Sequence, residues 1–570
     1  MSNRSMRLRI RIIAGLFIFF GVALFARFLY LQVYTGGQMG NLSDRQSAVV
    51  QEINAERGFI YDAKGRELAV SVEVPSIYAI TYQVKDAEKT AEKVAEVLGA
   101  NKTEILQKLK SGKSFVWLCR KTEYQKGKQL KALKLPGINM VLETKRFYPK
   151  GMLASHVLGF VNADALGCEG LEYAFGKYLN GKNGRLVSVK DKKGRIVASG
   201  EVEYEAPQNG YNLVLTLDEG VQSIAEEELN NVFEKFHAKE ATVLVMNPAT
   251  GEILALANRP NYDPNSFNEY PPAALKNRAV SAVYEPGSTF KAVTMAAAFT
   301  EKTISESDLL DCENGEWQIY GHKLSDHVKY GVMNFRDVIA NSSNIGTAKV
   351  GQMLGKEKLF KYARNFGFGD KTGIGLAGEL NGKLRTPDKW SGLSIYTVSI
   401  GQEISATPLQ VVSLYATIAN KGKLMQPMLV KAVKSKDGKI VKEFAPREVR
   451  QVVSAEVAER MMRVLKAAVE NGTGKEASVS GLSLAGKTGT AQKFDPVIKK
   501  YSGSKYVASF AGFAPAENPK LAILVVVDEP NASKGIYYGG SVAAPAFGKI
   551  AKRALRYLER KEHDDIVRNN

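Results

Sequence analysis

Ser288 and Lys291 lie three residues apart in AVYEPGSTFKAVT (residues 282–294), so both side chains share one face if the segment is helical. On a shared face a lysine can take the proton of a serine hydroxyl, which makes the serine a nucleophile for acyl transfer. Pro286 and Gly287 end what precedes them, and strong helix formers follow. We therefore expect Ser288 at or just inside a helix N-terminus, where backbone N–H groups favour a developing negative charge. The alternative is that Ser288 only caps the helix and Lys291 is solvated.

Two further stretches favour the catalytic interpretation. FRDVIANSSNIGTAKVG places Ser342 and Asn344 two residues apart, where a hydroxyl and an amide can both face a cleft. AGKTGTAQ, expected on a strand that enters a sheet, offers an ammonium and hydroxyls for a carboxylate and a glycine that lets a substrate backbone approach. These four residues are Lys487, Thr488, Gly489 and Thr490. Ser-x-x-Lys, Ser-x-Asn and Lys-Thr-Gly together are the signature of penicillin-binding proteins and serine β-lactamases.

The chain also contains a second copy of two of these motifs. Ser502 and Lys505 lie in YSGSKY, which we interpret as a turn that holds no shared face. Residues 371–373 spell Lys-Thr-Gly within FGFGDKTGIGLAGE, a glycine-rich loop without following strands. We predict that neither copy is catalytic.

The elements that would position the motifs can be read around them. NLVLTL, the pair within TVLVMNPATGEILALA, and the runs VASFAGFAP and LAILVVV have the pattern of strands, and an amphipathic helix is expected from Val221 to Phe236. Strands at both ends of this region predict one antiparallel sheet covered by helices. The preceding residues, about 41–210, mix short alternating segments with a lysine-rich helical stretch from Asp86 to Lys134 and read as a support module without a catalytic constellation.

The first residues indicate a membrane anchor. An apolar run from Ile12 to Ala26 continues to Leu31 with only Arg27 interrupting it, which is long enough to span a bilayer. A cleaved signal peptide is the alternative, but no small-x-small pattern follows directly. A basic flank predicts that the N-terminus is cytoplasmic and the rest lies outside. The flank holds Arg4, Arg7, Arg9 and Arg11.

Composition narrows the classes of protein to which the chain could belong. The length of 570 residues indicates two or three folded units, and 45% hydrophobic content argues that most of the chain folds. The net charge of +19 has no nucleic-acid motif beside it, so we expect no nucleic-acid partner. The three cysteines are expected to be buried as small apolar residues, and a single disulfide between two of them is the alternative. They are Cys119, Cys168 and Cys312. The five histidines form no metal motif, so no metal or cofactor is expected.

The chain resembles the class B penicillin-binding proteins over nearly its whole length. RGFIYDAKG (57–65), RFYPKGMLASHVLG (146–159) and GCEGLEY (167–173) match, in order, the boxes of that family's non-catalytic pedestal, and YEPGSTFK is the family's form of the nucleophile motif. Ala63-Lys64 departs from the arginine usual in the first box, which affects the pedestal alone. The short anchor, the absence of appended C-terminal repeats and the phrase SIGQEISATPLQ look most like the septal, cell-division transpeptidase. Elongation and sporulation types remain open.

The resemblance implies an α+β protein with a single N-terminal transmembrane helix, an elongated α/β pedestal and a serine transpeptidase domain of the penicillin-recognising fold. The expected parts are a cytoplasmic tail (1–11), an anchor (12–34), the pedestal (41–210), the transpeptidase domain (211–560) and a polar tail (561–570). It further implies location in the inner membrane with the catalytic domain in the periplasm. Expected partners are peptidoglycan stem peptides, inhibitory β-lactams, and a membrane glycan-strand polymerase with other division proteins.

The implied reaction is peptidoglycan D,D-transpeptidation. In the family's scheme Ser288 attacks the penultimate D-Ala carbonyl, Lys291 accepts its proton, and Ser342 returns a proton to the departing D-Ala. The backbone N–H groups of Ser288 and Thr490 would hold the oxyanion, and Asn344 the donor amide. Lys487, Thr488 and Thr490 would bind the terminal carboxylate. A β-lactamase, or a scaffold or β-lactam sensor without cross-linking activity, are the alternatives.

Overall fold

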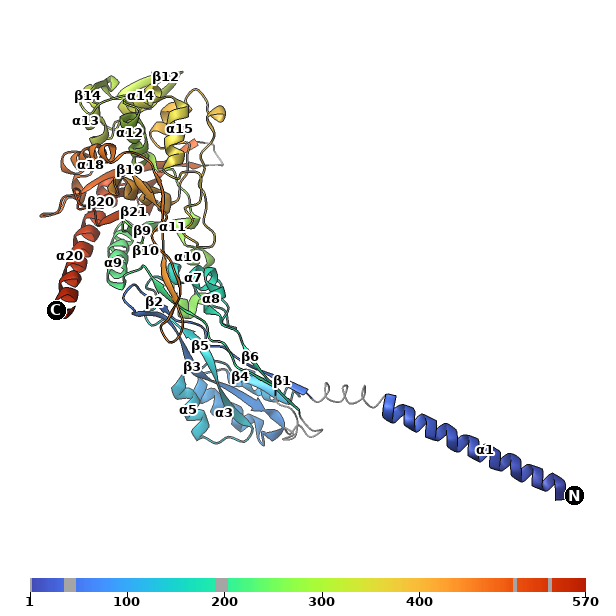
Figure 1. Ribbon diagram of the computed structural model, residues 1–570. Coiled ribbons are helices and arrows are strands. Elements are labelled where there is room, and N and C mark those ends of the chain that lie inside the picture. The colour runs from blue at the N-terminus through green and yellow to red at the C-terminus, as the bar shows by residue number, and fades with distance from the viewer. Residues whose placement is uncertain (1–2, 35–47, 190–202, 496–499, 532–535, 570) are drawn as a thin grey trace. The chain divides into compact units, whose positions relative to one another are not determined.

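The computed structural model describes residues 3–34, 48–189, 203–495, 500–531 and 536–569 (Figure 1). The chain divides into two compact units. One comprises residues 1–56 with 181–209, and the other residues 57–180 with 210–570. The expected start of the pedestal at residue 41 lies outside the described residues.

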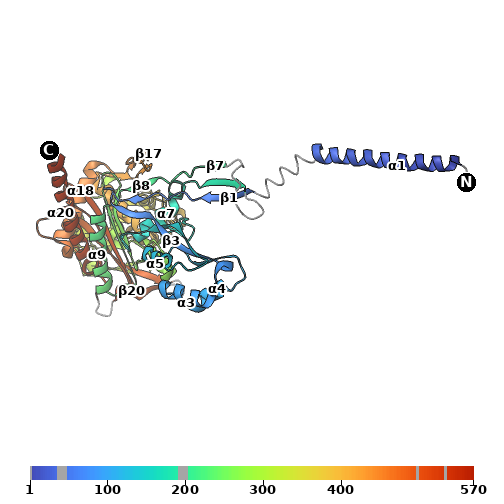
Figure 2. The same ribbon diagram turned by 90° about the horizontal axis from the view of Figure 1, so that it is seen from below.

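The first unit contains the expected apolar helix. Helix α1 (Asn3–Leu29) is followed by a π-helical turn (Tyr30–Tyr34), and residues 6–33 are long and apolar enough to cross a membrane, which suggests a membrane anchor. The same unit holds an antiparallel three-stranded sheet in the order β1-β6-β7 (Figure 2). Its strands are β1 (Ala48–Ile53), β6 (Gly184–Val189) and β7 (Glu203–Glu205).

The second unit begins with the non-catalytic part, where the long strand β3 (Glu67–Ile80) pairs with β5 (Ile138–Phe147). The expected helical stretch from Asp86 to Lys134 is confirmed in part, because it holds three helices but also a strand that was not expected. Gly99 ends the first helix in a left-handed conformation (φ +68°), and the aromatic run FVWLC forms a strand on β3. These elements are α3 (Ala87–Leu98), α4 (Lys102–Leu109), β4 (Phe115–Cys119) and α5 (Tyr124–Ala132).

NLVLTL is a strand, but it does not belong to the sheet that holds the Lys-Thr-Gly motif of residues 487–489. It forms β8 (Asn212–Leu215), which pairs in parallel with β2 (Ile60–Tyr61) and antiparallel with β16 (Val430–Lys434). A single sheet in the order β17-β16-β8-β2-β3-β4 therefore joins segments that are far apart in sequence.

The catalytic sheet is antiparallel and built from both ends of its region, as predicted, in the order β10-β9-β21-β20-β19. The predicted strand pair forms β9 and β10, and the two late apolar runs form β20 and β21. Their bounds are β9 (Glu240–Met246), β10 (Ile253–Arg259), β19 (Ala485–Asp495), β20 (Lys500–Ala514) and β21 (Leu521–Asp528). The Lys-Thr-Gly strand β19 lies at the edge of this sheet.

Helices cover both faces of the catalytic sheet (Figure 1). The predicted amphipathic helix is α9 (Glu219–Lys235), and it packs with α20 (Ala544–Asn569) on one face. On the other face lie α12 (Lys291–Thr300), α17 (Pro408–Ala419) and α18 (Ala455–Glu470). The nine residues from Lys291 to Phe299 are all buried, so the helix that follows Ser288 is a core element.

The expectation for the cysteines holds for one residue of three. Cys312 is buried, Cys119 is half-buried and Cys168 is exposed, and all three are free thiols. Cys312 also lies beside the candidate active site, since its Sγ is 3.4 Å from the hydroxyl of Ser343.

Candidate active site

Ser288 lies in the tight turn that opens helix α12, where we expected it. A 3₁₀ turn (Gly287–Phe290) leads directly into α12, and Gly287 adopts a left-handed conformation (φ +52°). The N–H of Gly287 donates to the carbonyl of Gly401 at 3.0 Å, which fixes the turn. Ser288 is partly exposed, and its hydroxyl forms no hydrogen bond with the residues that the structure describes. The hydroxyl is thus available to a substrate.

Lys291 brings the Ser-x-Asn motif to this helix. Its ammonium donates to the carbonyl of Ser342 at 2.7 Å and to Oδ1 of Asn344 at 2.8 Å, and the Ser342 hydroxyl lies 3.3 Å away. Ser342 has a left-handed backbone (φ +63°), and Asn344 begins α14 (Asn344–Leu354). The two motif side chains face one point, as expected. Within the described residues, however, Lys291 makes no hydrogen bond to Ser288.

The environment of Lys291 suits a proton acceptor. Burial lowers its pKa from 10.5 to about 7, while the carboxylate of Asp326 and the thiol of Cys312 oppose this shift. A lysine with that pKa is neutral in part of the population near neutral pH. It can therefore accept a proton from a hydroxyl in the site.

Lys487 is the second buried lysine of the site. Its ammonium lies 3.3 Å from the Thr488 hydroxyl and 3.4 Å from the Thr473 hydroxyl, and those two hydroxyls are 2.8 Å apart. Burial, followed by the positive charge of Lys291, lowers the pKa of Lys487 far below its usual range. Thr473 was missed in the sequence, because nothing in its type or spacing within NGTGK distinguishes it. The hydroxyls and ammonium form one polar cluster at the edge strand.

Thr490 and Gly489 complete the strand motif. The Thr490 hydroxyl accepts a hydrogen bond from the N–H of Gly539 at 2.9 Å. A Cβ at position 489 would lie 2.3 Å from the Ser509 hydroxyl and 3.1 Å from the carbonyl of Pro286. The missing side chain therefore makes room for the protein's own packing of β19 against the Ser288 turn. The expected close approach of a substrate backbone at this glycine stays a prediction.

Asp326 and His327 were also missed, because they stand alone in a loop between short strands. The Asp326 carboxylate accepts hydrogen bonds from Ser343 and from the start of α14. The ring of His327 meets that of Tyr538 edge to face at 5.4 Å between centroids. Partial burial and the charge of Lys291 lower the pKa of His327, against the opposing charge of Asp326. These residues had no motif spacing that could have revealed them.

The second copies of the two motifs, residues 371–373 and Ser502 with Lys505, do not repeat the arrangement around Ser288. The 371–373 copy lies in irregular backbone, where the N–H and the hydroxyl of Thr372 bond to Glu379 at 2.6 and 2.5 Å. The prediction that it is a loop is confirmed. YSGSKY is not a turn but the start of β20, so that expectation was wrong. The Ser502 hydroxyl there accepts from the N–H groups of Ser504 and Lys505 at 3.3 and 3.1 Å.

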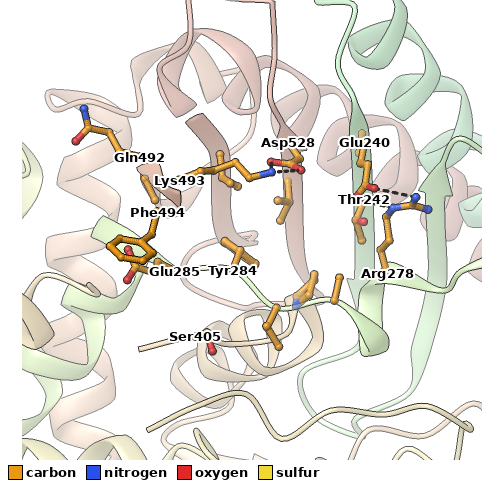
Figure 3. A pocket seen from close by; sticks show the side chains of 17 residues that line it. Glu240, Thr242, Arg278, Tyr284, Glu285, Ser405, Gln492, Lys493, Phe494 and Asp528 are labelled. Carbon is orange, nitrogen blue, oxygen red and sulfur yellow. Dashed lines mark hydrogen bonds and ion pairs between the residues drawn. The ribbon is translucent and has the colours of Figure 1, made fainter. Parts of the chain in front are cut away.

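A half-enclosed cavity of about 270 Å³ is lined in part by residues 282–285, which precede the turn of Ser288 (Figure 3). Two ion pairs line it, Arg278 with Glu240 at 2.7 Å and Lys493 with Asp528 at 2.8 Å. Tyr284 also lines it, two residues before Pro286. The cavity does not include the serine and lysines of the three motifs, so we do not assign it to the chemistry.

Comparisons with known proteins agree with this geometry. Residues 241–552 match the model of the penicillin binding protein transpeptidase domain, and residues 52–215 match that of the penicillin-binding protein dimerisation domain. Stage V sporulation protein D of Bacillus subtilis is 35% identical over 568 residues, covering 98% of this chain and 87% of the relative. Peptidoglycan D,D-transpeptidase FtsI of Escherichia coli is 32% identical over 558 residues, covering 96% and 92%.

Solved structures show the same likeness. Penicillin binding protein 3 of Mycobacterium tuberculosis, complexed with aztreonam, has a TM-score of 0.69 at 29% identity and covers 90% of this chain and 97% of its own. The same protein complexed with ampicillin is similar to this chain at 28% identity, also with a TM-score of 0.69. The fold and the arrangement of a serine, two buried lysines and a Lys-Thr-Gly edge strand define a penicillin-recognising serine acyltransferase. The chain belongs to the class B penicillin-binding proteins, in which a dimerisation domain precedes a transpeptidase domain.

Proposed function

We propose that this peptidoglycan D,D-transpeptidase cross-links stem peptides at the division septum through an acyl-enzyme on Ser288. The observation that carries the proposal is the convergence of three separate segments on one point: the turn of Ser288, the Ser342–Asn344 loop held by Lys291, and the edge strand with Lys487. The match to the transpeptidase domain model and the FtsI relatives support the reaction.

In the first half-reaction the Ser288 hydroxyl attacks the carbonyl carbon of the penultimate D-Ala of a donor peptide. A C–O bond forms, and the serine proton passes to the neutral amine of Lys291. The oxyanion lies between the backbone N–H groups of Ser288 and Thr490. When the tetrahedral intermediate collapses, the C–N bond to the terminal D-Ala breaks. Its nitrogen receives the proton by way of the Ser342 hydroxyl, which lies 3.3 Å from Lys291.

The same groups orient the donor. The Asn344 side chain holds the donor's amide, and its Nδ2 already donates to the carbonyl of Ser325 at 2.9 Å. Lys487, Thr488 and Thr490 bind the terminal carboxylate of the peptide. An incoming carboxylate compensates the positive charge that burial disfavours on Lys487, so substrate binding and protonation of this lysine support each other.

The acceptor decides the outcome of the second half-reaction. An amine from a neighbouring stem peptide attacks the acyl carbon and gives a proton to the neutral amine of Lys291. The new C–N bond forms, the C–O bond to Ser288 breaks, and the proton returns to the serine oxygen, whereas attack by water would give hydrolysis. A β-lactam follows the first step only and leaves a long-lived adduct. The solved structures of a relative complexed with aztreonam and with ampicillin support β-lactam binding by this chain.

The location and partners extend this proposal. Helix α1 anchors the chain in the inner membrane with its basic start in the cytoplasm, and the catalytic region lies outside. A membrane glycan-strand polymerase and other division proteins are the expected partners. A role in sporulation is the second candidate, because the Bacillus subtilis relative named for sporulation has 35% identity. An elongation role is equally compatible with the family.

Labelling tests the nucleophile. We expect the full-length chain in detergent micelles, incubated with a fluorescent penicillin, to carry one stable adduct, which peptide mass spectrometry locates on Ser288. The Ser288→Ala variant should carry none. An adduct at Ser502, or rapid turnover of the penicillin, would refute the assignment.

The septal role needs a test in cells. We expect the wild-type gene, but not the Ser288→Ala variant, to restore division in a strain depleted of its septal transpeptidase. Complementation by the variant would support a scaffold. Rescue of elongated growth or of sporulation, with no rescue of division, would move the chain to one of the other types.

A further inference from the structure

The carboxylate of Asp326 is hydrogen-bonded to the same Ser-x-Asn segment that Lys291 contacts. Asp326 follows strand β13 (His322–Ser325), and its Oδ2 accepts from the hydroxyl of Ser343 at 2.6 Å. Its Oδ1 accepts from the backbone N–H groups of Asn344 and, at 3.1 Å, of Ile345. These are the first N–H groups of helix α14, which have no partner inside the helix and favour a negative charge.

The backbone of Asp326 is held independently of the motif. The N–H of Asp326 donates to the carbonyl of Gly315 at 3.0 Å, and the N–H of Cys312 donates to the carbonyl of Gly331 at 3.0 Å. Two segments on either side of the loop are thereby tied together. Gly315 has φ +87°, and a Cβ there would come within 2.9 Å of Lys329. Backbone hydrogen bonds of the loop itself therefore hold Asp326 in place, and its position does not depend on attraction by the lysine.

The motif needs such a brace. Ser342 adopts a left-handed backbone (φ +63°), which a residue with a Cβ disfavours unless its surroundings hold it. Lys291 contacts Ser342 and Asn344, while Asp326 contacts Ser343 between them and the N–H of Asn344. The three-residue segment is thus clamped between an ammonium and a carboxylate.

We propose that Asp326 is a positioning residue of the transpeptidase, which clamps residues 342–344 against Lys291 through its hydrogen bonds to Ser343 and to the start of α14. The inference rests on the proposed function, in which Lys291 receives the serine proton. Asp326 does not touch the substrate. It acts through the orientation of Ser342 and Asn344 and through its charge.

The sign of the electrostatic effect follows from the groups around Lys291. Asp326 and the thiol of Cys312 favour its protonated form, and burial disfavours it. Lys487 and His327 are the other titratable groups, and the charge of Lys291 lowers the pKa of both. Removing the carboxylate of Asp326 leaves burial opposed by the Cys312 thiol alone. Lys291 then becomes neutral at a lower pH.

The test measures the rate of acylation of the full-length chain in detergent micelles by a fluorescent penicillin, as a function of pH. For Asp326→Asn we expect the maximal rate to fall by about tenfold to a hundredfold, because the motif loses its brace. We also expect the midpoint of the rise with pH to move about one unit towards acid. A wild-type rate and midpoint would overturn the proposal.

Two further variants separate charge from structure. Asp311→Asn removes an exposed carboxylate that bonds to the N–H of Glu313 at 2.9 Å, and we expect wild-type rate and midpoint. Ser343→Ala removes one bond of the clamp and keeps the charge, so the rate should fall while the midpoint stays. An equal shift of the midpoint in Asp311→Asn would overturn the assigned charge effect.

Folding and function can also be told apart. Thermal unfolding shows whether Asp326→Asn is folded. If it is not, a wild-type rate in Ser343→Ala overturns the clamp, and a reduced rate at an unchanged midpoint supports it. If the wild-type chain itself is not labelled at Ser288, the proposed function fails and this inference fails with it. Normal labelling of the wild type together with an unaffected Asp326→Asn refutes this inference alone.

Discussion

Two clusters of buried charge lie in the second unit, and they are built on opposite principles. In the non-catalytic part the carboxylate of Glu172 receives Arg57 at 2.6 Å and Arg146 at 2.6 Å, with all three side chains buried. In the catalytic part Lys291 and Lys487 are both buried, and the charge of the first lowers the pKa of the second. The first cluster places opposite charges together, whereas the second places like charges together.

The difference separates a structural role from a chemical one. A buried anion between two guanidinium groups is compensated and hydrogen-bonded. Its removal leaves the two positive charges buried without a partner, which destabilises the fold. Two buried ammonium groups disfavour each other's charge, which leaves one able to take a proton and the other in need of an anion. Asp326 is the carboxylate that opposes the lowered pKa of Lys291. The comparison predicts that mutations in the two clusters have opposite effects on stability and activity.

The largest expected effect is on acylation by Lys291→Met. We expect the rate of penicillin acylation to fall by about 10²- to 10⁴-fold, because the proton acceptor is lost. The free energy of unfolding near pH 7.5 should not fall, since burial lowers the pKa of Lys291 to about 7 and the unfolded chain keeps its proton at that pH. Stopped-flow labelling and denaturant unfolding measure the two quantities.

Lys349→Met is the matched control, since this partly buried lysine of α14 is paired with Glu313 at 2.6 Å and should leave acylation unchanged. Acylation of Lys291→Met at the wild-type rate, or a large loss of its stability, would contradict the comparison.

Glu172→Gln should show the converse pattern. Removing the charge leaves Arg57 and Arg146 without their anion, and we expect a loss of about 3–5 kcal/mol in the free energy of unfolding. The acylation rate of the folded protein should stay within about twofold, because a structural ion pair does not act on the reaction. Denaturant unfolding and penicillin labelling of the same sample measure both.

Glu143→Gln is the control for this prediction, because Glu143 pairs with the exposed Arg120 at 2.6 Å. A pair in contact with water is worth less than about 1 kcal/mol. If the two glutamate variants lose the same stability, the buried cluster is not the special structural element that we infer.

The pH dependence of acylation gives an intermediate effect. Since burial lowers the pKa of Lys291 to about 7, the neutral form dominates above pH 7. We expect the acylation rate to level off above pH 8 and to fall about tenfold for each pH unit below pH 6. Rates across pH 5 to 9, with the fold checked at each pH, test this. A midpoint near the ordinary lysine value would mean that Lys291 stays charged and another group takes the proton.

The sequence could predict the catalytic cluster in part, for physical reasons that differ between residues. Ser288 and Lys291 are linked by local helix geometry, so their spacing carries the information. Thr473 and Asp326 meet the motifs only through tertiary pairing, and a lone threonine or aspartate in a loop has no periodicity to reveal it. The reason for Gly489 was likewise hidden, because the atoms that would clash with a Cβ belong to other segments.

The strands of the fold likewise divide into those that local sequence predicts and those that depend on distant partners. The strands of the catalytic sheet were predictable because each is a continuous apolar run bounded by turn residues. The strand β4 was lost within a lysine-rich stretch, because its five residues become a strand only when they pair with β3. The strand β8 was recognised as a strand, but its partners β2 and β16 are separated from it by about 150 and 220 residues, and no local pattern encodes such pairing.

The smallest expected effect belongs to the decoy serine, and it sharpens what makes a serine catalytic. Ser502 and Lys505 repeat the Ser-x-x-Lys spacing on strand β20, where side chains three apart point to opposite faces. The Ser502 hydroxyl bonds only to local groups, the N–H groups of Ser504 and Lys505 and the Ser504 hydroxyl, and no buried lysine contacts it among the described residues. Ser502→Ala should leave acylation unchanged and shift the free energy of unfolding by less than about 0.5 kcal/mol. Reduced labelling in this variant, with Ser288 intact, would show that spacing matters more than burial and helix geometry.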